Sequence, residues 1–266
     1  MEAYKIIDAH CHIYPDKIAR KASDSTSEFY HMPSLFDGKI STLLEEGTKA
    51  GIGHFVIQSV ATTPHQVSSI NHFIAGAVAS GEGRFTGLGT LHPDSENIEA
   101  EVEEILALGL KGVKLHPDIQ RFPIDADRVH RIYEACEGRL PILMHTGDHR
   151  FDFSNPNRMK PILDRYKNLT VIGAHFGGWS VWDEAERMLT GYENFYVDCS
   201  SSLYAMSPEK AGELIAAYGV DRVLFGTDYP MWDIEADLAR FMKIDLTDGA
   251  RRAILSENAR RLFGIK

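Results

Sequence analysis

Lys5-Ile6-Ile7-Asp8-Ala9-His10-Cys11-His12 is a short apolar run that ends in two histidines, close to the start of the chain. If this run forms one β-strand, its side chains alternate between two faces. One face then carries Asp8, His10 and His12, and the other face carries the residues between them. Two imidazoles side by side at the end of a strand can bind one cation. Taken alone, the pattern fits a surface His-x-His pair equally well.

Three later apolar runs also end in a residue that can bind a metal ion. The runs are 141–144, 170–174 and 223–227, and the residues that follow them are His145, His175 and Asp228. A single histidine after an apolar run is usually a hydrogen-bonded core residue. Four such strand ends in one chain favour a different interpretation, in which several strands contribute to one site.

The whole chain alternates short apolar runs with longer amphipathic segments. We predict eight strands, at 5–10, 54–60, 85–91, 112–115, 141–145, 170–175, 195–198 and 223–226. Helical patterns lie between them, at 40–50, 65–80, 96–108, 126–137, 156–166, 181–189 and 208–218. Eight βα units favour a closed (β/α)₈ TIM barrel, since an open sheet would usually carry a glycine-rich phosphate loop after its first strand, and the sequence has none there. We therefore predict a single α/β domain over residues 1–266.

One long stretch, Tyr14–Asp37, has no helical or strand period. It follows the first predicted strand and is expected over the mouth of the barrel. It reads either as a disordered surface loop or as a lid. We favour the lid, because long loops in compact domains usually serve function.

Composition limits the classes of partner. The formal net charge is −10 and no basic block is present, so the sequence does not favour a nucleic-acid partner. The three cysteines are widely spaced and predict no disulfide framework. With no room for a signal peptide before the first strand and no membrane-length apolar run, we expect a cytoplasmic protein that does not enter a membrane. We expect a small-molecule substrate, and the sequence leaves open whether the chain forms a homo-oligomer.

In a parallel barrel the carboxyl ends of all strands open on one face. His10, His12, His145, His175 and Asp228 are therefore expected to converge. Imidazole nitrogens with one carboxylate suit Zn²⁺ first, with Fe²⁺, Mn²⁺ and Co²⁺ as alternatives. An incompletely filled coordination shell would hold a water and lower its pKa to about 7.

These motifs resemble those of the amidohydrolase superfamily. Its amidohydrolase-related branch is indicated by three segments: His175-Phe176-Gly177-Gly178, Gly226-Thr227-Asp228-Tyr229-Pro230 and the terminal Asn258-Ala259-Arg260-Arg261-Leu262-Phe263. That branch includes aminocarboxymuconate-semialdehyde decarboxylase-like enzymes, resorcylate-type decarboxylases and lactone hydrolases. The resemblance extends over essentially the whole chain.

The resemblance implies a role for each strand-end residue. His10, His12, His145 and Asp228 match the ligands of a single divalent metal ion. His175 matches the histidine that hydrogen-bonds the metal-activated water. Asp228 would then serve both as a ligand and as the general base.

Four further residues lie at the ends of predicted strands or shortly after them. Lys114 and His116 share a face of the fourth strand, and Arg150 follows the fifth; we interpret these three as candidate substrate-binding residues. Relatives with two metals carry a carboxylated lysine at the position of Lys114, but the other motifs favour one metal. Asp198, at the end of the seventh strand, is either a contact at the barrel rim or a cap of the next helix, and we favour the cap.

The leading hypothesis is a metal-dependent hydrolase that acts on an ester, lactone or amide. The alternative is a non-oxidative decarboxylase of an aromatic or unsaturated carboxylic acid, because the same ligands serve both reactions. A third hypothesis is a catalytically silent barrel that only binds metal.

Overall fold

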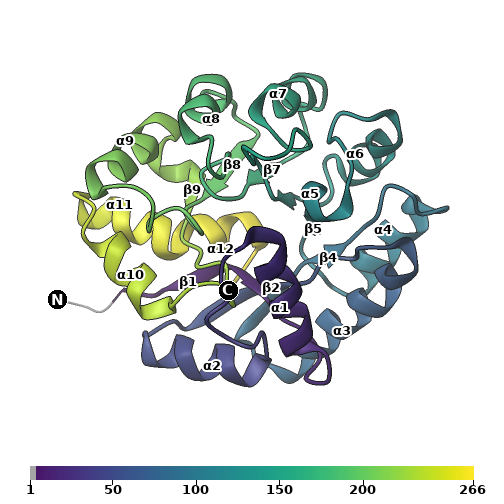
Figure 1. The fold of residues 1–266 in the computed structure, drawn as a ribbon, viewed down its shortest axis with the longest axis horizontal. Coiled ribbons are helices and arrows are strands. Elements are labelled where there is room, and N and C mark those ends of the chain that lie inside the picture. The colour runs from purple at the N-terminus through teal and green to yellow at the C-terminus, as the bar shows by residue number, and fades with distance from the viewer. Residues whose placement is uncertain (1–3) are drawn as a thin grey trace.

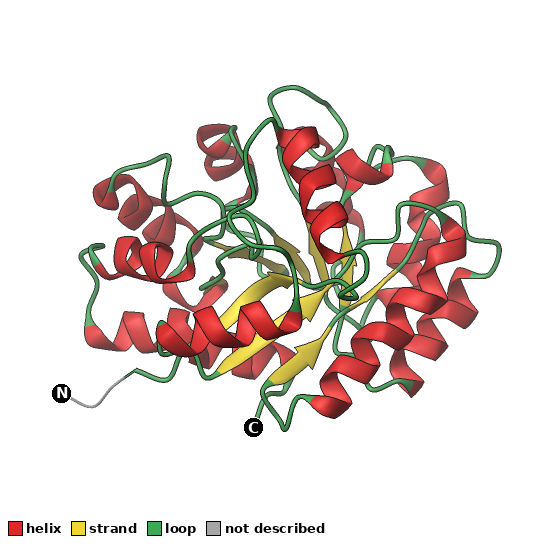
Figure 2. Cartoon of the chain, turned by 60° about the horizontal axis from the view of Figure 1, so that its bottom comes forward, coloured by secondary structure: helices red, strands yellow, loops and turns green. Residues whose placement is uncertain are grey.

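The strands of the protein pair in parallel and lie inside a ring of helices, as a computed structural model describes for residues 4–266 (Figure 1 and Figure 2). The strands are β1 (Ile7–His12), β2 (His54–Gln58), β3 (Phe85–Gly87), β4 (Gly89–Thr90), β5 (Val113–Leu115), β6 (Ile142–Met144), β7 (Val171–Gly173), β8 (Phe195–Asp198) and β9 (Val223–Leu224). They form two sheets, β1-β2-β3 and β4-β5-β6-β7-β8-β9.

Backbone hydrogen bonds join these two sheets into one barrel. β3 and β4 are parts of one predicted strand: the Leu88 N–H donates to the Ile57 carbonyl, and the Gly89 N–H donates to the Gly112 carbonyl. At the other seam the Ala9 N–H donates to the carbonyl of Phe225 over 2.8 Å. Eight strand positions therefore close on themselves, and the predicted (β/α)₈ barrel is confirmed.

Helices follow the strands as the periodicity predicts. They are α1 (Ala19–Tyr30), α2 (Ile40–Lys49), α3 (Val67–Ser80), α4 (Ile98–Ala107), α5 (Pro117–Gln120), α6 (His130–Cys136), α7 (Pro156–Arg165), α8 (Trp182–Leu189), α9 (Pro208–Tyr218), α10 (Ile234–Met242), α11 (Asp248–Arg252) and α12 (Asn258–Phe263). Short 3₁₀ turns lie at Pro64–Gln66, Asp127–Val129 and Val220–Arg222, and a π-helical turn lies at Ala253–Glu257. Among residues 4–266, none of the helices is long and apolar enough to cross a membrane.

We predicted no regular structure over Tyr14–Asp37. This prediction is wrong, because the stretch contains α1. The helix is rich in Ser, Thr and Asp, which are weak helix formers, and its apolar residues are few, so a sequence pattern detects it poorly. Its buried positions are Ala19 and Ser23, and the Ser23 hydroxyl donates to the Phe36 carbonyl. Tertiary contacts rather than propensity therefore support α1.

We also predicted that the side chains of β1 alternate strictly between two faces, and this prediction is wrong. The register of β1 against β2 shifts between Asp8 and Cys11. As a result Ala9 packs with Val56 inside the barrel, while the next side chain, His10, lines the cavity at the barrel mouth. Such an irregularity places two consecutive side chains on the same side of a strand.

The Asp8 carboxylate joins the first and last strands instead of lying beneath the histidines. It is buried and accepts hydrogen bonds from the backbone N–H groups of His10 and Thr227 and from the Thr227 hydroxyl. Burial raises the pKa of this carboxyl to about 6. Asp8 thus helps to close the barrel directly below the cavity.

We expect Asp8→Asn to lower the free energy of unfolding by about 1–3 kcal/mol, because a neutral amide oxygen accepts the two backbone N–H groups more weakly than a carboxylate and the amide nitrogen would face the Thr227 hydroxyl that now donates. Urea unfolding followed by circular dichroism measures this change. The exposed Asp245, changed to Asn in the same way, should shift stability by less than about 0.5 kcal/mol. Equal effects of the two variants would contradict the role of Asp8.

Candidate active site

The strand ends open into one cavity of about 410 Å³. Its lining includes all the predicted metal-binding and catalytic residues and two of the three predicted substrate-binding residues: His10, His12, Lys114, His116, His145, His175 and Asp228. Residues of α1, among them Phe29 and Tyr30, form part of the wall, together with Trp179 and Trp232. Residues from distant parts of the sequence therefore converge, as the parallel barrel predicts.

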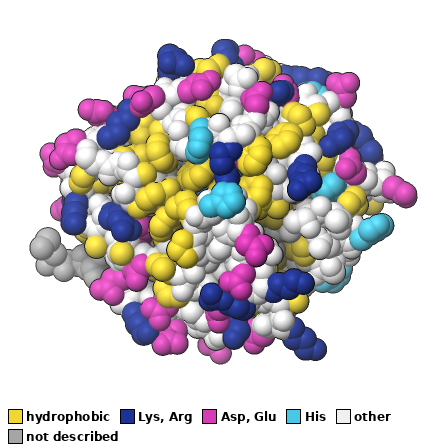
Figure 3. Space-filling view, viewed as in Figure 1, with side chains coloured by type: hydrophobic (Ala, Val, Ile, Leu, Met, Phe, Trp, Pro, Cys, Tyr) yellow, Lys and Arg dark blue, Asp and Glu magenta, His cyan; other side chains and the backbone are white. Residues whose placement is uncertain are grey.

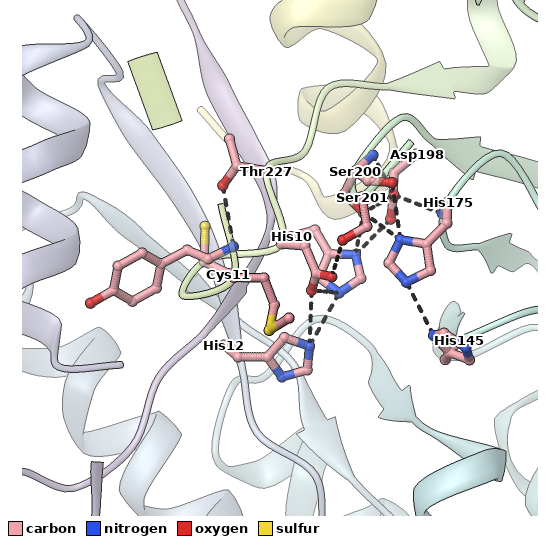
Figure 4. A network of polar contacts seen from close by, with 12 residues as sticks. His10, Cys11, His12, His145, His175, Asp198, Ser200, Ser201 and Thr227 are labelled. Atoms are coloured by element: carbon pink, nitrogen blue, oxygen red, sulfur yellow. Dashed lines mark hydrogen bonds and ion pairs between the residues drawn. The ribbon is translucent and has the colours of Figure 1, made fainter. Parts of the chain in front are cut away.

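Three acceptor atoms form a tight group at this cavity. The Nε2 atoms of His10 and His12 lie 3.2 Å apart (Figure 4). The Oδ1 atom of Asp228 is 3.3 Å from the first and 3.6 Å from the second. Two imidazole nitrogens and a carboxylate oxygen in this arrangement are a donor set that a divalent metal prefers.

Asp198 holds His10 in place, which the sequence analysis did not predict. Its Oδ2 atom accepts a hydrogen bond from Nδ1 of His10 over 2.8 Å, and both side chains are buried. Its Oδ1 atom accepts from the backbone N–H groups of His175 and Ser200. The helix-cap interpretation is therefore wrong, and the N-cap of α9 is Ser207 instead.

This hydrogen bond fixes the tautomer of His10. A carboxylate can only accept, so the ring proton of neutral His10 lies on Nδ1 and Nε2 presents a lone pair to the cavity. Burial, with Lys114 nearby, keeps the pKa of His10 well below its usual value. The imidazole is therefore neutral and in the form that binds a metal.

His145 and His175 form a second pair beside the first. Nε2 of His175 lies 3.1 Å from Nδ1 of His145. Nδ1 of His175 lies 2.9 Å from the oxygen of the Ser200 hydroxyl, and this hydroxyl donates a hydrogen bond to Oδ1 of Asp198. Burial lowers the pKa of His175 to about 3, so its ring is neutral near pH 7. Among the described residues, the candidate ligand groups are His10–His12–Asp228 and His10–His175–Asp198, and His145 belongs to neither.

His175 and Asp228 both have left-handed backbone conformations, each with φ of 61°. Such conformations are costly for residues other than glycine and are concentrated at functional sites. The turn after His145 also approaches the turn after His175 closely: a Cβ on Gly147 would lie 2.6 Å from the Gly178 backbone. These strand-end turns require glycine or strained backbone to present their side chains.

Lys114 brings a positive charge to the bottom of the cavity. It is fully buried, and its Nζ atom lies 3.1 Å from Nε2 of His10. Burial lowers the pKa of this ammonium, while the carboxylates of Asp228 and Asp198 oppose that shift. Burial likewise raises the pKa of Asp228. A cation therefore faces the space in which a substrate anion would bind.

His116 lies at the start of α5 and has two partners. Its Nδ1 atom accepts a hydrogen bond from the Ile119 N–H, as the cap of that helix, and its Nε2 atom lies 2.7 Å from the Tyr30 hydroxyl. Its ring also stacks on that of His145, with centroids 4.1 Å apart. Tyr30 lines the cavity, and the sequence analysis did not predict this role.

Arg150 does not line the cavity. Its guanidinium makes paired hydrogen bonds to Asp148 and donates to the Phe29 carbonyl over 2.7 Å. It also lies over the rings of Phe29, Tyr30 and Trp179. The structure thus places Arg150 behind α1 rather than beside the space that we expected it to line.

Apolar side chains gather on the face that Figure 3 shows, around basic and histidine side chains near its centre. Ile18, Leu35 and Phe151 are among the large apolar side chains that are exposed to solvent. Two of the three belong to the 14–37 stretch, which contributes α1 to the cavity wall.

Solved structures with the same fold span the full chain. An uncharacterised TIM-barrel protein from Bordetella bronchiseptica has a TM-score of 0.80 and 23% identity, with 98% of each chain covered. A dihydroxybenzoic acid decarboxylase from a Polaromonas species, with bound manganese and an inhibitor, has a TM-score of 0.74 and 17% identity, with 98% of this chain and 97% of that chain covered. A probable 2-pyrone-4,6-dicarboxylic acid hydrolase from Acinetobacter baumannii, with citric acid bound, has a TM-score of 0.71 and 17% identity, with 98% of this chain and 99% of that chain covered.

At these identities the structural similarity establishes the fold alone. No curated protein matches the chain significantly. The family model described as Amidohydrolase (Amidohydro_2) matches residues 7–265. The resemblance inferred from the strand-end motifs is thus confirmed, and the chain belongs to the amidohydrolase family of enzymes.

Proposed function

We propose that the protein is a metal-dependent hydrolase that cleaves an ester, lactone or amide bond of a small molecule. The observation that carries this proposal is the group formed by His10, His12 and Asp228, whose acceptor atoms lie 3.2–3.6 Å apart at a cavity large enough for a small substrate. Catalytic metal sites in proteins often use three protein ligands and leave a position for substrate or water.

The residues present fit a divalent metal ion. A carboxylate oxygen and two imidazole nitrogens, one of them with its lone pair fixed by Asp198, lie within 3.2–3.6 Å of one another, and the negative carboxylate adds repulsion between lone pairs. A bound cation would relieve that repulsion. We keep His145 as a proposed fourth ligand from the family resemblance, although its ring contacts His175 and His116 here.

A metal bound at this site would polarise a substrate carbonyl and lower the pKa of water. The identity of the ion stays open between Zn²⁺, which the ligand types favour, and Mn²⁺, which the Polaromonas decarboxylase holds. Two metals per chain, bridged by a carboxylated Lys114, remain the less favoured alternative.

The residues of the chain would handle protons and charge. Asp228 is oriented by the Ser201 hydroxyl, which donates to its Oδ2 atom over 2.5 Å, and can take a proton from water. His175 is neutral and stacks beside His10, so it can accept a hydrogen bond from water or pass a proton on without holding it. The Lys114 ammonium can balance negative charge on the substrate. Hydrolysis needs one group to take a proton and another to return it, and this cavity offers both.

A second candidate is decarboxylation of an aromatic or unsaturated carboxylic acid. It is favoured by the aromatic walls of the cavity, from Phe29, Tyr30, Trp179 and Trp232, and by the cation of Lys114. The similar fold of the Polaromonas decarboxylase adds support. Decarboxylation needs only one proton donor to the carbon that loses CO₂, so the second proton carrier would have no role in it.

The two reactions differ in product mass. We expect the metal-loaded protein to add water to a lactone or ester such as dihydrocoumarin or phenyl acetate, and to leave 2,6-dihydroxybenzoate intact. Mass spectrometry of the products measures this directly. Loss of CO₂ from 2,6-dihydroxybenzoate, with no hydrolysis in the ester panel, would favour the second candidate instead.

Removal of the metal should abolish turnover. We expect about one divalent ion per chain by elemental analysis, loss of activity after dialysis against a chelator, and recovery when Zn²⁺ or Mn²⁺ is returned. His12→Ala serves as the matched variant that should neither hold the ion nor recover. A protein that retains full activity without any metal would contradict the proposal. A protein that neither binds metal nor converts any of the test substrates would instead be a catalytically silent barrel.

Asp198→Asn should weaken metal binding by about 10- to 100-fold, because it loses the carboxylate that orients His10. The amide oxygen can still accept from the backbone, so the fold should be kept. Competition with a coloured chelator measures the affinity. The exposed Asp183, changed to Asn, is the control and should leave the affinity unchanged.

A further inference from the structure

Helix α1 lines the cavity with the polar side chains of Ser25, Thr26 and Tyr30, and Tyr30 contacts the histidines. Tyr30 is the last residue of α1, and its ring packs edge-on against Trp179 with centroids 5.2 Å apart. Its hydroxyl lies 2.7 Å from Nε2 of His116. Tyr30 and Lys114 both line this cavity.

The hydrogen bond by which His116 caps α5 determines whether His116 or Tyr30 is the donor in the bond between them. The Ile119 N–H can only donate, so Nδ1 of His116 is an acceptor without a proton. In the neutral ring the proton therefore lies on Nε2, and His116 donates to the oxygen of Tyr30. The Tyr30 hydroxyl accepts this bond, and its own hydrogen points elsewhere.

That hydrogen has no well-placed acceptor on the protein. Besides His116, the Tyr30 oxygen contacts only the two ring nitrogens of His145 among its described polar contacts, both at 3.4 Å. An O–H donor normally lies 2.5–3.0 Å from its acceptor, so neither contact is a strong hydrogen bond. The chain thus fixes a donor in its cavity and leaves its acceptor to be supplied.

Arg150 fixes the position of this donor. Its guanidinium centre lies 5.0 Å from the ring centroid of Phe29 and 5.1 Å from that of Tyr30. It also donates to the Phe29 carbonyl at the end of α1, while Asp148 holds its other nitrogens. Arg150 therefore ties the end of α1 to the loop after β6.

We propose that Tyr30 is a substrate-contacting hydrogen-bond donor, which binds a carbonyl or carboxylate oxygen of the substrate, and that Arg150 is its positioning residue. The inference rests on the proposed function, since it assigns a specificity role within the same cavity. The substrate class is a small molecule with an oxygen acceptor on the side that faces α1 and a ring or planar group that packs against Trp179.

Tyr30→Phe removes the hydroxyl and keeps the ring. On the probe that wild type converts, dihydrocoumarin or 2,6-dihydroxybenzoate, we expect kcat/KM to fall about 10-fold, the effect of one lost hydrogen bond. Metal content and the circular dichroism spectrum should not change. Tyr133→Phe is the matched control, because the Tyr133 hydroxyl bonds to the Ile124 carbonyl in the core, and it should lower stability without changing kcat/KM.

Arg150→Lys tests the positioning role. A single ammonium cannot bind both Asp148 and the Phe29 carbonyl as the guanidinium does, so we expect KM to rise roughly 3- to 10-fold. Because Arg150 acts through Tyr30, the double variant should lose less than the product of the two single effects. Arg20→Lys, at an exposed ion pair of the same helix, should behave as wild type.

The outcomes separate the two proposals. A wild-type chain that holds no metal or converts neither probe overturns the proposed function, and this inference with it. An active wild type whose Tyr30→Phe variant keeps the same kcat/KM overturns the inference alone. Fully multiplicative effects in the double variant would overturn the positioning role of Arg150.

Discussion

The hydrogen bond between Asp198 and His10 is the interaction on which the rest of the site depends. Both side chains are buried, and a buried carboxylate is costly unless donors surround it. Here the donors are the His10 ring and the backbone N–H groups of His175 and Ser200. One carboxylate therefore sets the orientation of His10 and fixes the turn that presents His175, so two strand ends share one anchor.

The fold was predictable from the sequence because its signals are local and repeated. Apolar runs separated by amphipathic segments identify eight strand positions without any knowledge of contacts. The shift in β1 was not predictable, because a period of two is the default for a strand and the shift reflects its pairing with β2. Helix α1 was missed for a related reason: its support comes from contacts with Phe36 and Arg150, which lie outside the helix.

The candidate site was predictable to the extent that it lies at strand ends. His10, His12, His175 and Asp228 follow apolar runs, and the parallel barrel brings such positions together. Asp198 also ends a strand, so its position could have placed it at the site. We missed its role toward His10 because we interpreted it as a helix cap. Tyr30 carried no such signal: the stretch around it was expected over the mouth of the barrel, but nothing in the sequence singled out this residue within that stretch.

Burial explains why these residues form a site for a cation and not a set of ordinary ion pairs. Removed from water, the imidazoles of His10, His12 and His145 have pKa values well below the usual range and stay neutral. Neutral imidazoles offer lone pairs, and the carboxylate of Asp228 adds negative charge to them. Within the cavity the Lys114 ammonium lies close to this group, 3.1 Å from His10. A bound metal and Lys114 would then repel each other, and the carboxylates of Asp228 and Asp198, which favour the charged form of Lys114, are the groups of the chain that offset this repulsion.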